Sequence, residues 1–511
     1  MTAEPGTGKT VSLEVLAART AQARAAGRKV VHCHGVFDLL HIGHIRYLEG
    51  ARRLGDMLVV TITPDHFVGK GPERPAFTAA LRAEALAALA CVDMVAVNRW
   101  PTAVEVIGLL RSHYYVKGAE YRDAANDPTG KIVDEAEAAR AAGTEVRFID
   151  DIVFSSSNLI NRFLPAHPPE VRDWLAEFRT RVGAKAVLEW MERAENLRVL
   201  CLGEAIIDEY HFCDTLGKSG KEPILAARFV SAERFAGGIL AIANHAAGLS
   251  RRVEMLTALG EYDTHEDFIR GKLHPAVTPR FLTQPDAPTI VKRRFVELYP
   301  PQKLFEVYVM NDCEETEAMG RALRAAVAER LPEVDCVVVA DYGHGLLDPQ
   351  TIEFLCEKAP YLAVNVQVNA GNIGFNTISK YRRADFVCIS EKELRLDARS
   401  RARPLERLME DAAGRLGCGR LCITQGKQGC LAWGAGQGVF RAPALTGSIV
   451  DRIGAGDAVL AYAAQLAAAG APAEIVGFVG NAAGAQAVAT LGNKEPVDGV
   501  ALKKHIVALL K

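Results

Sequence analysis

Short apolar segments alternate with helical patterns along the first third of the chain. An N-terminal helix is expected after Ser12, a suitable N-cap, and before Gly27. The apolar segments that follow lie at 29–36, 57–62, 94–97 and 114–116, and segments with apolar residues at helical spacing lie between them, from about 45 and at 79–89 and 103–110. This succession predicts a parallel sheet with helices on both faces, as in α/β nucleotide-binding domains.

The pattern breaks at 165–169, where the sequence reads Pro-Ala-His-Pro-Pro, and then starts again. Further strands are predicted at 198–202, 336–340, 362–366, 386–389 and 421–424. We therefore predict an α/β protein with two doubly wound domains, 1–165 and 197–511, joined by a helical linker at 166–196. Residues 289–310 have the composition of a β-hairpin, which together with 224–230 is expected to form a small β lid.

The composition describes a globular protein with sizeable cores. Hydrophobic residues make up 49% and charged residues 24%, which excludes a disordered or collagen-like chain. Lys and Arg number 60 against 62 Asp and Glu, so no basic field favours nucleic acid or an anionic membrane as a partner. Small-molecule chemistry is the better expectation.

The 11 cysteines are scattered without a CxxC pair, and residues 1–9 lack the apolar core of a secretion signal. These features predict reduced thiols and a cytoplasmic protein. We interpret Cys418 and Cys422 as core residues, because no second Cys/His pair stands near enough to complete a zinc site. The apolar stretch 458–473 is too short and too weakly apolar for a membrane span and is expected to be a buried helix.

A first candidate site follows the first strand, in the string Gly35-Val36-Phe37-Asp38-Leu39-Leu40-His41-Ile42-Gly43-His44. His41 and His44 lie three apart at a predicted helix start, where free backbone amides also point outward. Such a corner suits a polyphosphate, and Gly43 lets a phosphate approach the backbone. An isolated HxxH pair would also be compatible with zinc, but the whole string at a strand-to-helix turn predicts nucleotide binding.

This string resembles the GxFDxxHxGH signature of the cytidylyltransferase-like nucleotidyltransferases, and the resemblance covers about 29–164. Three further segments and one arginine resemble the branch that acts on sugar phosphates: Lys70-Gly71-Pro72-Glu73-Arg74-Pro75, Arg82, Val116-Lys117-Gly118-Ala119-Glu120-Tyr121 and Phe154-Ser155-Ser156-Ser157. The resemblance implies that His41 and His44 hold a triphosphate and that Lys70 neutralises it. It also implies a nucleotide site completed by Gly35, Phe37, Asp38, Gly43, Arg82, Lys117, Ser155, Ser156 and Ser157.

The implied reaction is displacement at the α-phosphorus of a nucleoside triphosphate by a phosphate oxygen, with release of pyrophosphate. The attacking phosphate is already ionised, so the site must supply alignment and charge neutralisation, with Mg²⁺ expected to share that load. ATP and CTP both stay open as donors. Class I aminoacyl-tRNA synthetases also carry a HIGH element, but neither a KMSKS-like loop nor a basic surplus occurs here.

A second candidate site lies at Asp451-Arg452-Ile453-Gly454-Ala455-Gly456-Asp457-Ala458. The amides of Gly454, Ala455 and Gly456 can surround a transferring phosphoryl group while Asp457 acts as general base on an acceptor hydroxyl. An ordinary helix cap is the alternative for this Asp. The segment Thr424-Gln425-Gly426-Lys427-Gln428-Gly429, which follows a strand, favours a kinase site.

Both strings are similar to those of the ribokinase/PfkB carbohydrate kinases, and the likeness covers about 198–492. Gly203-Glu204 with Asp208, Gly237-Gly238 and Asp341-Tyr342-Gly343-His344-Gly345 also match, the last resembling the DYGKG of heptose-7-phosphate kinases. The resemblance implies a sugar site at Asp208, Gly237, Gly238 and Asp341 and a nucleotide site at Thr424, Gly426 and Gly429. It also implies a lid that covers the sugar and joins subunits into a homo-oligomer.

Three positions depart from the kinase pattern: Ala241 and Ser390 replace expected asparagines, and Asn365 replaces an expected aspartate. Glu393 is left as the candidate metal ligand. Loss of a directional hydrogen bond to a substrate hydroxyl can change specificity by orders of magnitude. The kinase half is therefore open to a different sugar, a weak activity or a purely sugar-binding role.

Taken together, the chain resembles the bifunctional heptose kinase/adenylyltransferase family with its halves in the opposite order. The predicted function is phosphorylation of a sugar or sugar phosphate, followed by nucleotide transfer to a sugar 1-phosphate, giving an ADP-heptose-like product. The alternative is an active nucleotidyltransferase fused to a non-catalytic or re-specialised sugar-binding domain. The expected ligands are sugar phosphates and nucleoside triphosphates.

Overall fold

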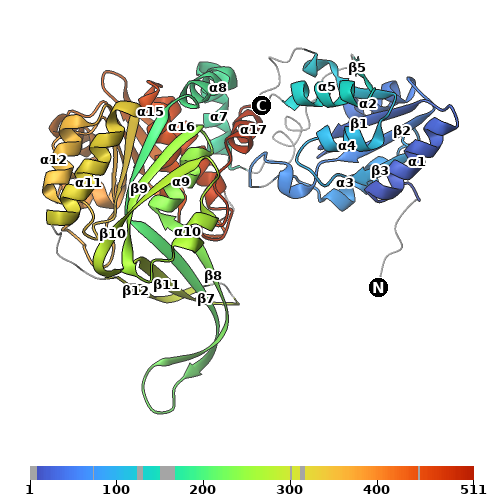
Figure 1. Cartoon of the computed structure of the whole chain (residues 1–511). Coiled ribbons are helices and arrows are strands. Elements are labelled where there is room, and N and C mark those ends of the chain that lie inside the picture. The colour runs from blue at the N-terminus through green and yellow to red at the C-terminus, as the bar shows by residue number, and fades with distance from the viewer. Residues whose placement is uncertain are drawn as a thin grey trace. The chain divides into compact units, whose positions relative to one another are not determined.

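The computed structural model describes residues 8–72, 74–122, 131–149, 167–299, 302–310, 317–446 and 449–511. The chain forms two compact units, and each is described by itself (Figure 1). The first unit contains residues 1–168 and also 500–511, and the second contains residues 169–499. The first unit is therefore built from two segments of chain that are far apart in the sequence.

The first unit contains a five-stranded parallel sheet in the order β3-β2-β1-β4-β5. The strands are β1 (Val30–Gly35), β2 (Met57–Ile62), β3 (Met94–Val97), β4 (Tyr114–Gly118) and β5 (Glu145–Ile149). The helices are α1 (Leu13–Ala25), α2 (Ile42–Arg52), α3 (Ala79–Ala87), α4 (Val104–Leu110) and α5 (Lys131–Ala141). The strand order reverses between β1 and β4, and ligands of such sheets bind at the carboxyl ends of the strands at this point.

Burial explains why these segments are strands. All six residues of β2 are buried, as expected for a strand covered on both faces by helices. One apolar cluster, which includes Leu16 and Ile107, packs on one face of the sheet, and another, which includes Leu48 and Leu86, packs on the other. Ser12 caps α1 by accepting a hydrogen bond from the Val15 amide, as predicted.

The second unit is centred on a nine-stranded sheet in the order β10-β9-β6-β13-β14-β15-β16-β17-β18. Its strands are β6 (Arg198–Gly203), β9 (Arg252–Tyr262), β10 (Val277–Pro288), β13 (Cys336–Asp341), β14 (Leu362–Val366), β15 (Phe386–Ser390), β16 (Arg420–Thr424), β17 (Cys430–Gly434) and β18 (Gly438–Ala442). Pairing is parallel from β10 to β16 and antiparallel for the last two strands. The predicted fold class of two doubly wound α/β parts is confirmed.

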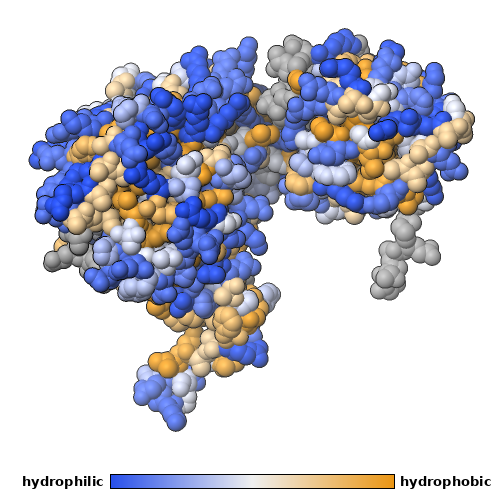
Figure 2. Space-filling view, viewed as in Figure 1, coloured by the Kyte–Doolittle hydropathy of each residue, from blue (hydrophilic) through white to orange (hydrophobic). Residues whose placement is uncertain are grey.

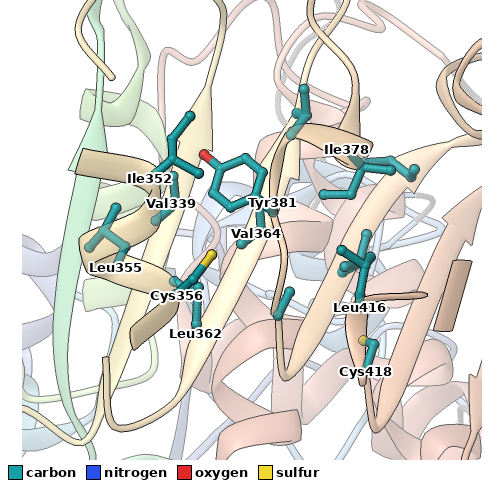
Figure 3. Close-up of a cluster of buried hydrophobic side chains, with 14 of the residues drawn as sticks. Val339, Ile352, Leu355, Cys356, Leu362, Val364, Ile378, Tyr381, Leu416 and Cys418 are labelled. Carbon is teal, nitrogen blue, oxygen red and sulfur yellow. The ribbon is translucent and has the colours of Figure 1, made fainter. Parts of the chain in front are cut away.

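Helices cover both faces of this sheet. They are α7 (Pro169–Arg181), α8 (Gly183–Ala194), α9 (Ile239–Ala247), α10 (Glu266–Lys272), α11 (Glu317–Arg330), α12 (Pro349–Lys358), α13 (Glu391–Asp397), α14 (Leu405–Leu416), α15 (Ala455–Ala468) and α16 (Ala473–Ala487). Leu355 of α12 and Val364 of β14 belong to the large apolar cluster on one face (Figure 3). Cys418 lies in the same cluster and Cys422 is fully buried, so both are core residues.

Helix α17 (Gly499–Leu509) follows, and from Val500 onward the chain belongs to the first unit. Within the part of the chain that the structure describes, no helix is both long and apolar enough to cross a membrane.

A separate four-stranded sheet forms the predicted lid, in the order β12-β11-β7-β8. Its strands are β7 (Ala205–Lys218), β8 (Leu225–Gly238), β11 (Ile290–Glu297) and β12 (Gln302–Val309). β7 and β8 extend from the second unit as a long ribbon, and apolar residues are visible along it (Figures 1 and 2). Because side chains alternate across a strand, Asp208 and Tyr210 face one side of the lid and His211 faces the other.

Two candidate active sites

The first site is built at the β1–α2 turn, at the point where the strand order reverses. His41 caps α2, and the Gly43 amide donates a hydrogen bond to His41 Nδ1 at 3.1 Å. In the neutral imidazole the ring proton is then on Nε2, which can donate to a phosphate oxygen. The rings of His41 and His44 are stacked with centroids 4.0 Å apart, so both imidazoles act at one place.

Phe37 fixes the position of His44. Its ring meets the His44 imidazole edge-on, with centroids 5.2 Å apart. A Cβ on Gly35 would lie 3.1 Å from the Phe37 ring, so the glycine leaves the space that this ring occupies. Phe37 itself has a positive φ of 49°, which is uncommon for a bulky residue and marks a tightly constrained turn.

Asp38 and Arg82 hold this turn in place. Asp38 accepts hydrogen bonds from the Ala76 amide at 2.6 Å and from Arg74 at 3.3 Å. Arg82, which is only 2% exposed, donates to the carbonyls of Val36 and Thr63. The guanidinium of Arg82 is thus occupied by protein groups, namely these carbonyl groups and the Asp65 carboxylate at 2.6 Å, and it supports the loop.

Burial keeps His41 and His44 neutral, and nearby positive charges add to this effect at His44. Burial, together with the neighbouring His41 and Lys70, lowers the pKa of His44 to about 3. Burial also lowers the pKa of His41, and burial with nearby Lys511 lowers the pKa of Lys70 to about 8. Before a ligand binds at neutral pH, the imidazoles are neutral donors beside a lysine that is still largely protonated, and an anionic ligand favours the protonated form of all three groups.

Lys117 comes from the end of β4, next to β1. Its ammonium forms an ion pair with Glu135 Oε2 at 2.8 Å and lies 5.4 and 5.3 Å from the ring centroids of Tyr115 and Tyr121. Glu135, on α5, also accepts a hydrogen bond from the Tyr115 hydroxyl at 3.0 Å. Sequence reasoning missed Glu135, because nothing in an ordinary acidic helix shows that one carboxylate is buried against a lysine on a strand.

Two further histidines lie on β1, and the sequence analysis did not single them out. His32 Nε2 and His34 Nδ1 each lie 2.8 Å from Thr61 Oγ1 on β2. Burial lowers the pKa of both, so both are neutral. The sequence did contain a signal for this pair: the two histidines are two residues apart in a predicted strand, which places both side chains on one face of it. The predicted residues Ser155, Ser156 and Ser157 lie outside the described part of the chain.

The second site forms around the N-terminus of α15. Gly454 precedes the helix with a φ of 84°, and a Cβ there would overlap the Asn493 side chain. Only glycine fits this position without strain. The amides of Ala455 and Gly456 open the helix, which gives an N-terminus suited to a phosphoryl group.

Asp457, in the first turn of α15, has the protonation behaviour of a general base. Burial raises its pKa to about 7, and the negative charge of Asp208 adds to this effect. The Tyr342 hydroxyl, which donates to Asp457 Oδ1 at 3.1 Å, and Lys292 act in the opposite direction. A base with a pKa near neutral pH is well suited to accept a proton from a substrate hydroxyl.

The sugar site predicted at Asp208 and Gly237-Gly238 is a single cluster. A Cβ on Gly237 would overlap the Asp208 carboxylate, and a Cβ on Gly238 would overlap the Glu204 carbonyl. Asp208 forms an ion pair with Arg294 of the lid strand β11. Asp208 is close enough to Asp457 for its negative charge to raise the pKa of that carboxyl, so the two carboxylates lie in the same region of the second unit.

Three cations of the lid contribute to this site. Lys292 is 6% exposed and lies 5.1 and 5.8 Å from the ring centroids of Tyr308 and Tyr342. Burial lowers its pKa. Besides Arg294, Lys303 of β12 forms an ion pair with Asp451 at 2.6 Å, which links the lid to the loop before α15.

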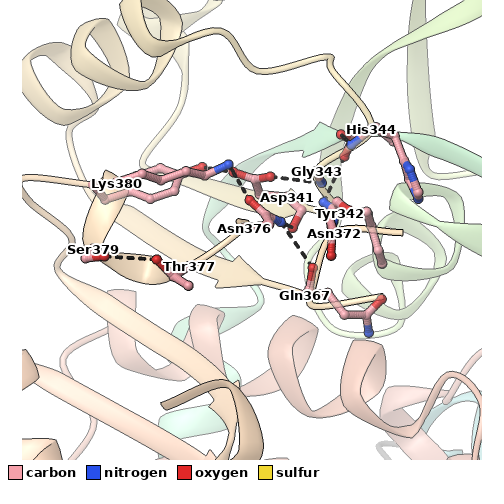
Figure 4. A network of polar contacts seen from close by, with 12 residues as sticks. Asp341, Tyr342, Gly343, His344, Gln367, Asn372, Asn376, Thr377, Ser379 and Lys380 are labelled. Atoms are coloured by element: carbon pink, nitrogen blue, oxygen red, sulfur yellow. Dashed lines mark hydrogen bonds and ion pairs between the residues drawn. The ribbon is translucent and has the colours of Figure 1, made fainter. Parts of the chain in front are cut away.

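Asp341 is the centre of a polar network that holds the 341–345 loop (Figure 4). It accepts hydrogen bonds from the Tyr381 hydroxyl at 2.8 Å and the Gly343 amide at 3.1 Å, and it pairs with Lys380 at 2.6 Å. The predicted substrate-binding role thus falls on a carboxylate that is occupied by protein groups. Its visible function in the structure is to position the loop that carries Tyr342.

The same loop is held from two other sides. Glu204 accepts hydrogen bonds from the amides of Tyr342 and His344, both at 3.0 Å. Burial and the nearby Asp341 raise the pKa of Glu204 to about 7. Asn369 and Asn372 each donate to the Tyr342 carbonyl at 2.8 Å, which gives the amide-rich segment a structural role that the sequence did not reveal.

The predicted nucleotide loop lies at the β16–β17 turn. Thr424 ends β16 and pairs with Cys430 of β17. Gly426 and Gly429 have positive φ values of 57° and 87°, and a Cβ on Gly429 would overlap the Ala442 carbonyl. These glycines are therefore needed for the turn itself.

Glu393 does not have the surroundings of a metal ligand. Its carboxylate accepts hydrogen bonds from the amides of Ser390 at 2.7 Å and Val368 at 3.1 Å, and Ser390 completes a capping box at the start of α13. Asn365 donates to the Cys388 carbonyl at 2.6 Å. Among the described residues, no group of three or more His, Cys, Asp or Glu side chains could hold a metal ion. These residues do not fit a Mg²⁺ ion held by protein groups alone.

Comparison with known proteins gives the class of each part. Residues 196–498 match the pfkB family of carbohydrate kinases, and residues 32–162 match the cytidylyltransferase-like family. Since the first match covers more than half of the chain, the chain belongs to the pfkB carbohydrate kinase family. Its N-terminal part is a cytidylyltransferase-like domain, as the GxFDxxHxGH string predicted.

Part of the chain is similar to curated proteins that are named as bifunctional. The bifunctional protein HldE of Syntrophotalea carbinolica is 40% identical over 144 residues, which cover 28% of each chain. HldE of Geobacter sulfurreducens is 38% identical over 167 residues, 32% of this chain and 33% of the relative. HldE of Magnetococcus marinus is 50% identical over 101 residues, 19% of this chain and 21% of the relative. Each match thus spans no more than about a third of the relative's length.

Solved structures resemble the second unit. A variant of phosphofructokinase-2 from Escherichia coli is covered over 100% of its length by 62% of this chain, with a TM-score of 0.51 and 16% identity. The complex of the same enzyme with potassium has a TM-score of 0.50 and 17% identity. At this level of identity the likeness is one of fold.

Proposed function

We propose that the chain is a bifunctional enzyme that phosphorylates a sugar phosphate in its second unit and attaches a nucleotide to a sugar 1-phosphate in its first unit. The product is a nucleotide-activated sugar of the ADP-heptose type. The observation that carries the proposal is one chain with two candidate phosphate sites of different design. One has stacked imidazoles at a helix N-terminus, and the other has a carboxylate with a pKa of about 7 beside a glycine-rich helix start.

In the kinase reaction, a substrate hydroxyl oxygen attacks the γ-phosphorus of ATP. Asp457 takes the hydroxyl proton, the bond between the γ-phosphorus and the β,γ-bridging oxygen breaks, and ADP leaves. The amides at the start of α15 stabilise the charge that develops on the transferred group. Asp208 binds the hydroxyl groups of the sugar, and Mg²⁺ enters as part of the nucleotide substrate.

In the nucleotidyl transfer, an oxygen of the sugar 1-phosphate attacks the α-phosphorus of the nucleoside triphosphate. The bond to the β-phosphate breaks and pyrophosphate leaves. His41, His44 and Lys70 bind the triphosphate and stabilise the leaving group. The reaction needs no protein base, because the attacking oxygen is already ionised. We propose ATP as the donor, with CTP as the competing possibility.

Lys292 favours a substrate that carries a phosphate of its own. It is a buried ammonium in a site that also contains Asp457 and Asp208, and it lies close to two aromatic rings. Burial lowers its pKa, and the negative charge of Asp208, its register partner on the neighbouring strand, acts in the opposite direction. A buried cation next to aromatic faces is well suited to an anionic substrate group. A sugar phosphate therefore fits the site better than a neutral sugar.

The decisive experiment incubates the purified chain with ATP and heptose 7-phosphate, with and without a phosphatase that turns the bisphosphate into the 1-phosphate. ADP formation without phosphatase and nucleotide-sugar formation with it are expected. Replacement of ATP by CTP in the second step identifies the nucleotide donor. Absence of both products would defeat the heptose version of the proposal.

A second candidate function keeps the nucleotidyltransferase but makes the second unit a non-catalytic sugar sensor. Ala241, Asn365 and Ser390 favour it, together with the engagement of Glu393 by backbone amides. If Asp457→Asn leaves every measured activity unchanged, this candidate gains. If the substitution abolishes ADP formation, the sensor reading fails.

We also propose a homo-oligomer formed through the outer face of the lid, in a cytoplasmic protein. Phe229, His211, Phe295 and Phe305 form a row of rings across all four lid strands, with neighbouring centroids 4.5 to 5.6 Å apart. Phe229 and Phe305 are more than half exposed. An aromatic row on an exposed sheet face is a favourable contact surface for a second copy.

A further inference from the structure

Helix α17 contacts the loop that carries Lys70. Within the first unit, a Cβ on Gly69 would lie 3.2 Å from Ala501 Cβ, and a Cβ on Gly71 would lie 2.7 Å from the His505 ring. The Lys504 side chain lies beside Gly69 as well. Residues 501, 504 and 505 share one face of a helix, so this face supports both sides of Lys70.

The loop and the helix fit closely. Gly69 and Gly71 have φ values of 59° and 112°, so the backbone adopts a conformation that glycine allows and then meets the helix without intervening side chains. His505 is only 3% exposed, and burial lowers its pKa to about 3, so its ring packs against the loop as a neutral group. Lys511 lies near enough to Lys70 to lower the pKa of that lysine.

We propose that the 500–511 segment is a positioning element of the nucleotidyl-transfer site, in which Ala501 and His505 fix the 69–71 loop and thereby hold Lys70 toward the triphosphate. This inference rests on the proposed function of the first unit. It means that a segment following the kinase unit in the sequence completes the transferase site. Lys70 stands between two glycines, which allow the backbone many conformations, and the contact with the helix face restricts the loop to one of them.

The test compares His505→Ala with Val507→Ala in the whole chain, since Val507 lies roughly 120° or more around the axis of α17 from Ala501 and His505, the two residues that meet the glycines. Pyrophosphate release from a nucleoside triphosphate and a sugar 1-phosphate is measured, with ADP formation by the kinase unit as internal control. His505→Ala is expected to lower kcat/KM for pyrophosphate release about tenfold or more, a size known for misplaced catalytic groups. His505→Phe, which keeps a ring on Gly71, is expected to restore most of it.

A double-mutant cycle separates positioning from a general loss of structure. If His505 acts through Lys70, Lys70→Met combined with His505→Ala is no slower than Lys70→Met alone. Fully additive losses overturn the proposal. So does an equal loss for Val507→Ala and His505→Ala.

Hydrogen exchange of peptides covering 66–76 gives a readout that does not depend on activity. His505→Ala is expected to speed exchange in these peptides while α3 and α4 keep their protection. Unchanged exchange overturns the link between helix and loop. If the unmodified chain releases no pyrophosphate with any nucleotide, the proposed function fails, and the exchange comparison still decides whether the helix holds the loop.

Discussion

At the residue scale, Asp457 is expected to determine the pH dependence of the proposed kinase reaction. A base must be deprotonated to accept the hydroxyl proton, and burial raises its pKa to about 7. We expect kcat/KM for ADP formation to rise with pH and to level off above about 7. Tyr342→Phe removes a hydrogen bond that lowers this pKa, so its profile is expected to move to higher pH.

The measurement is the initial rate of ADP formation at limiting sugar phosphate between pH 5.5 and 9, roughly two units on either side of the pKa. Asp457→Asn is expected to lower kcat by about 10²–10⁴, the usual contribution of a general base. A profile that is flat across this range would contradict the role of Asp457.

The paired imidazoles carry a separate prediction. In the proposed transfer the two imidazoles bind the triphosphate, so His44→Ala is expected to lower kcat for pyrophosphate release by about 10²–10³. ADP formation by the second unit serves as the internal control, and His66→Ala, at an exposed histidine of the same unit, as the matched variant. Equal effects of the two substitutions would show that the stacked pair has no special part in the transfer.

A third residue prediction concerns Lys292. Lys292→Met keeps most of the side-chain volume but removes the buried charge. We expect KM for a sugar phosphate to rise by about tenfold or more while KM for ATP changes little, because a hydrogen bond to a charged group contributes about 1.5–3 kcal/mol. Steady-state kinetics with the two substrates varied in turn makes the comparison. Equal rises in KM for the sugar phosphate and KM for ATP would contradict a role of Lys292 in binding the phosphate of the sugar.

At the element scale, the core on one face of the large sheet depends on α12. Leu355 is fully buried among the strands and helices of the cluster in Figure 3. Leu355→Ala is expected to lower the free energy of unfolding by about 2–5 kcal/mol, since it leaves a cavity. Urea unfolding followed by tryptophan fluorescence reports it, because Trp433 packs against this cluster. Ile373→Ala, at a residue that is 54% exposed, is the control and should have little effect.

The hydrophobic pattern predicted the bounds of strands correctly where most residues of the strand are buried. The segments 57–62 and 94–97 are strands with the predicted bounds, because parallel strands that are buried over all or most of their length are nearly continuous apolar runs. β8 was predicted only at 224–230 and runs from Leu225 to Gly238. Its middle is exposed and polar, so apolar periodicity could not reveal it.

The candidate sites were predictable where one short segment supplies them. His41 with His44, and Gly454 with Asp457, are adjacent in sequence as well as in space. The bonds between Lys117 and Glu135, and between Asp457 and Tyr342, join residues that are distant in the sequence. Asp341 and Glu393 likewise accept hydrogen bonds from residues that are distant in the sequence, and no local sequence pattern predicts such contacts.

At the scale of the whole molecule, the lid is expected to set the oligomeric state. Phe229→Asp combined with Phe305→Asp places charges in the aromatic row and should shift the protein toward monomers in light scattering coupled to size exclusion. Phe375→Asp, at a residue that is 89% exposed outside the lid, should leave the state unchanged. If the unmodified protein is a monomer in the same measurement, the proposed contact between lids is wrong.

Because the first unit is built from two segments that are far apart in the sequence, the order of synthesis also limits when each unit can finish folding on the ribosome. Residues 169–499 are synthesised before 500–511, and domains generally fold as units while synthesis proceeds. All residues of the second unit are therefore present before the first unit is complete, although synthesis starts with the first unit. A nascent chain that stops short of Val500 would contain all the residues of the second unit but would lack the final helix of the first unit.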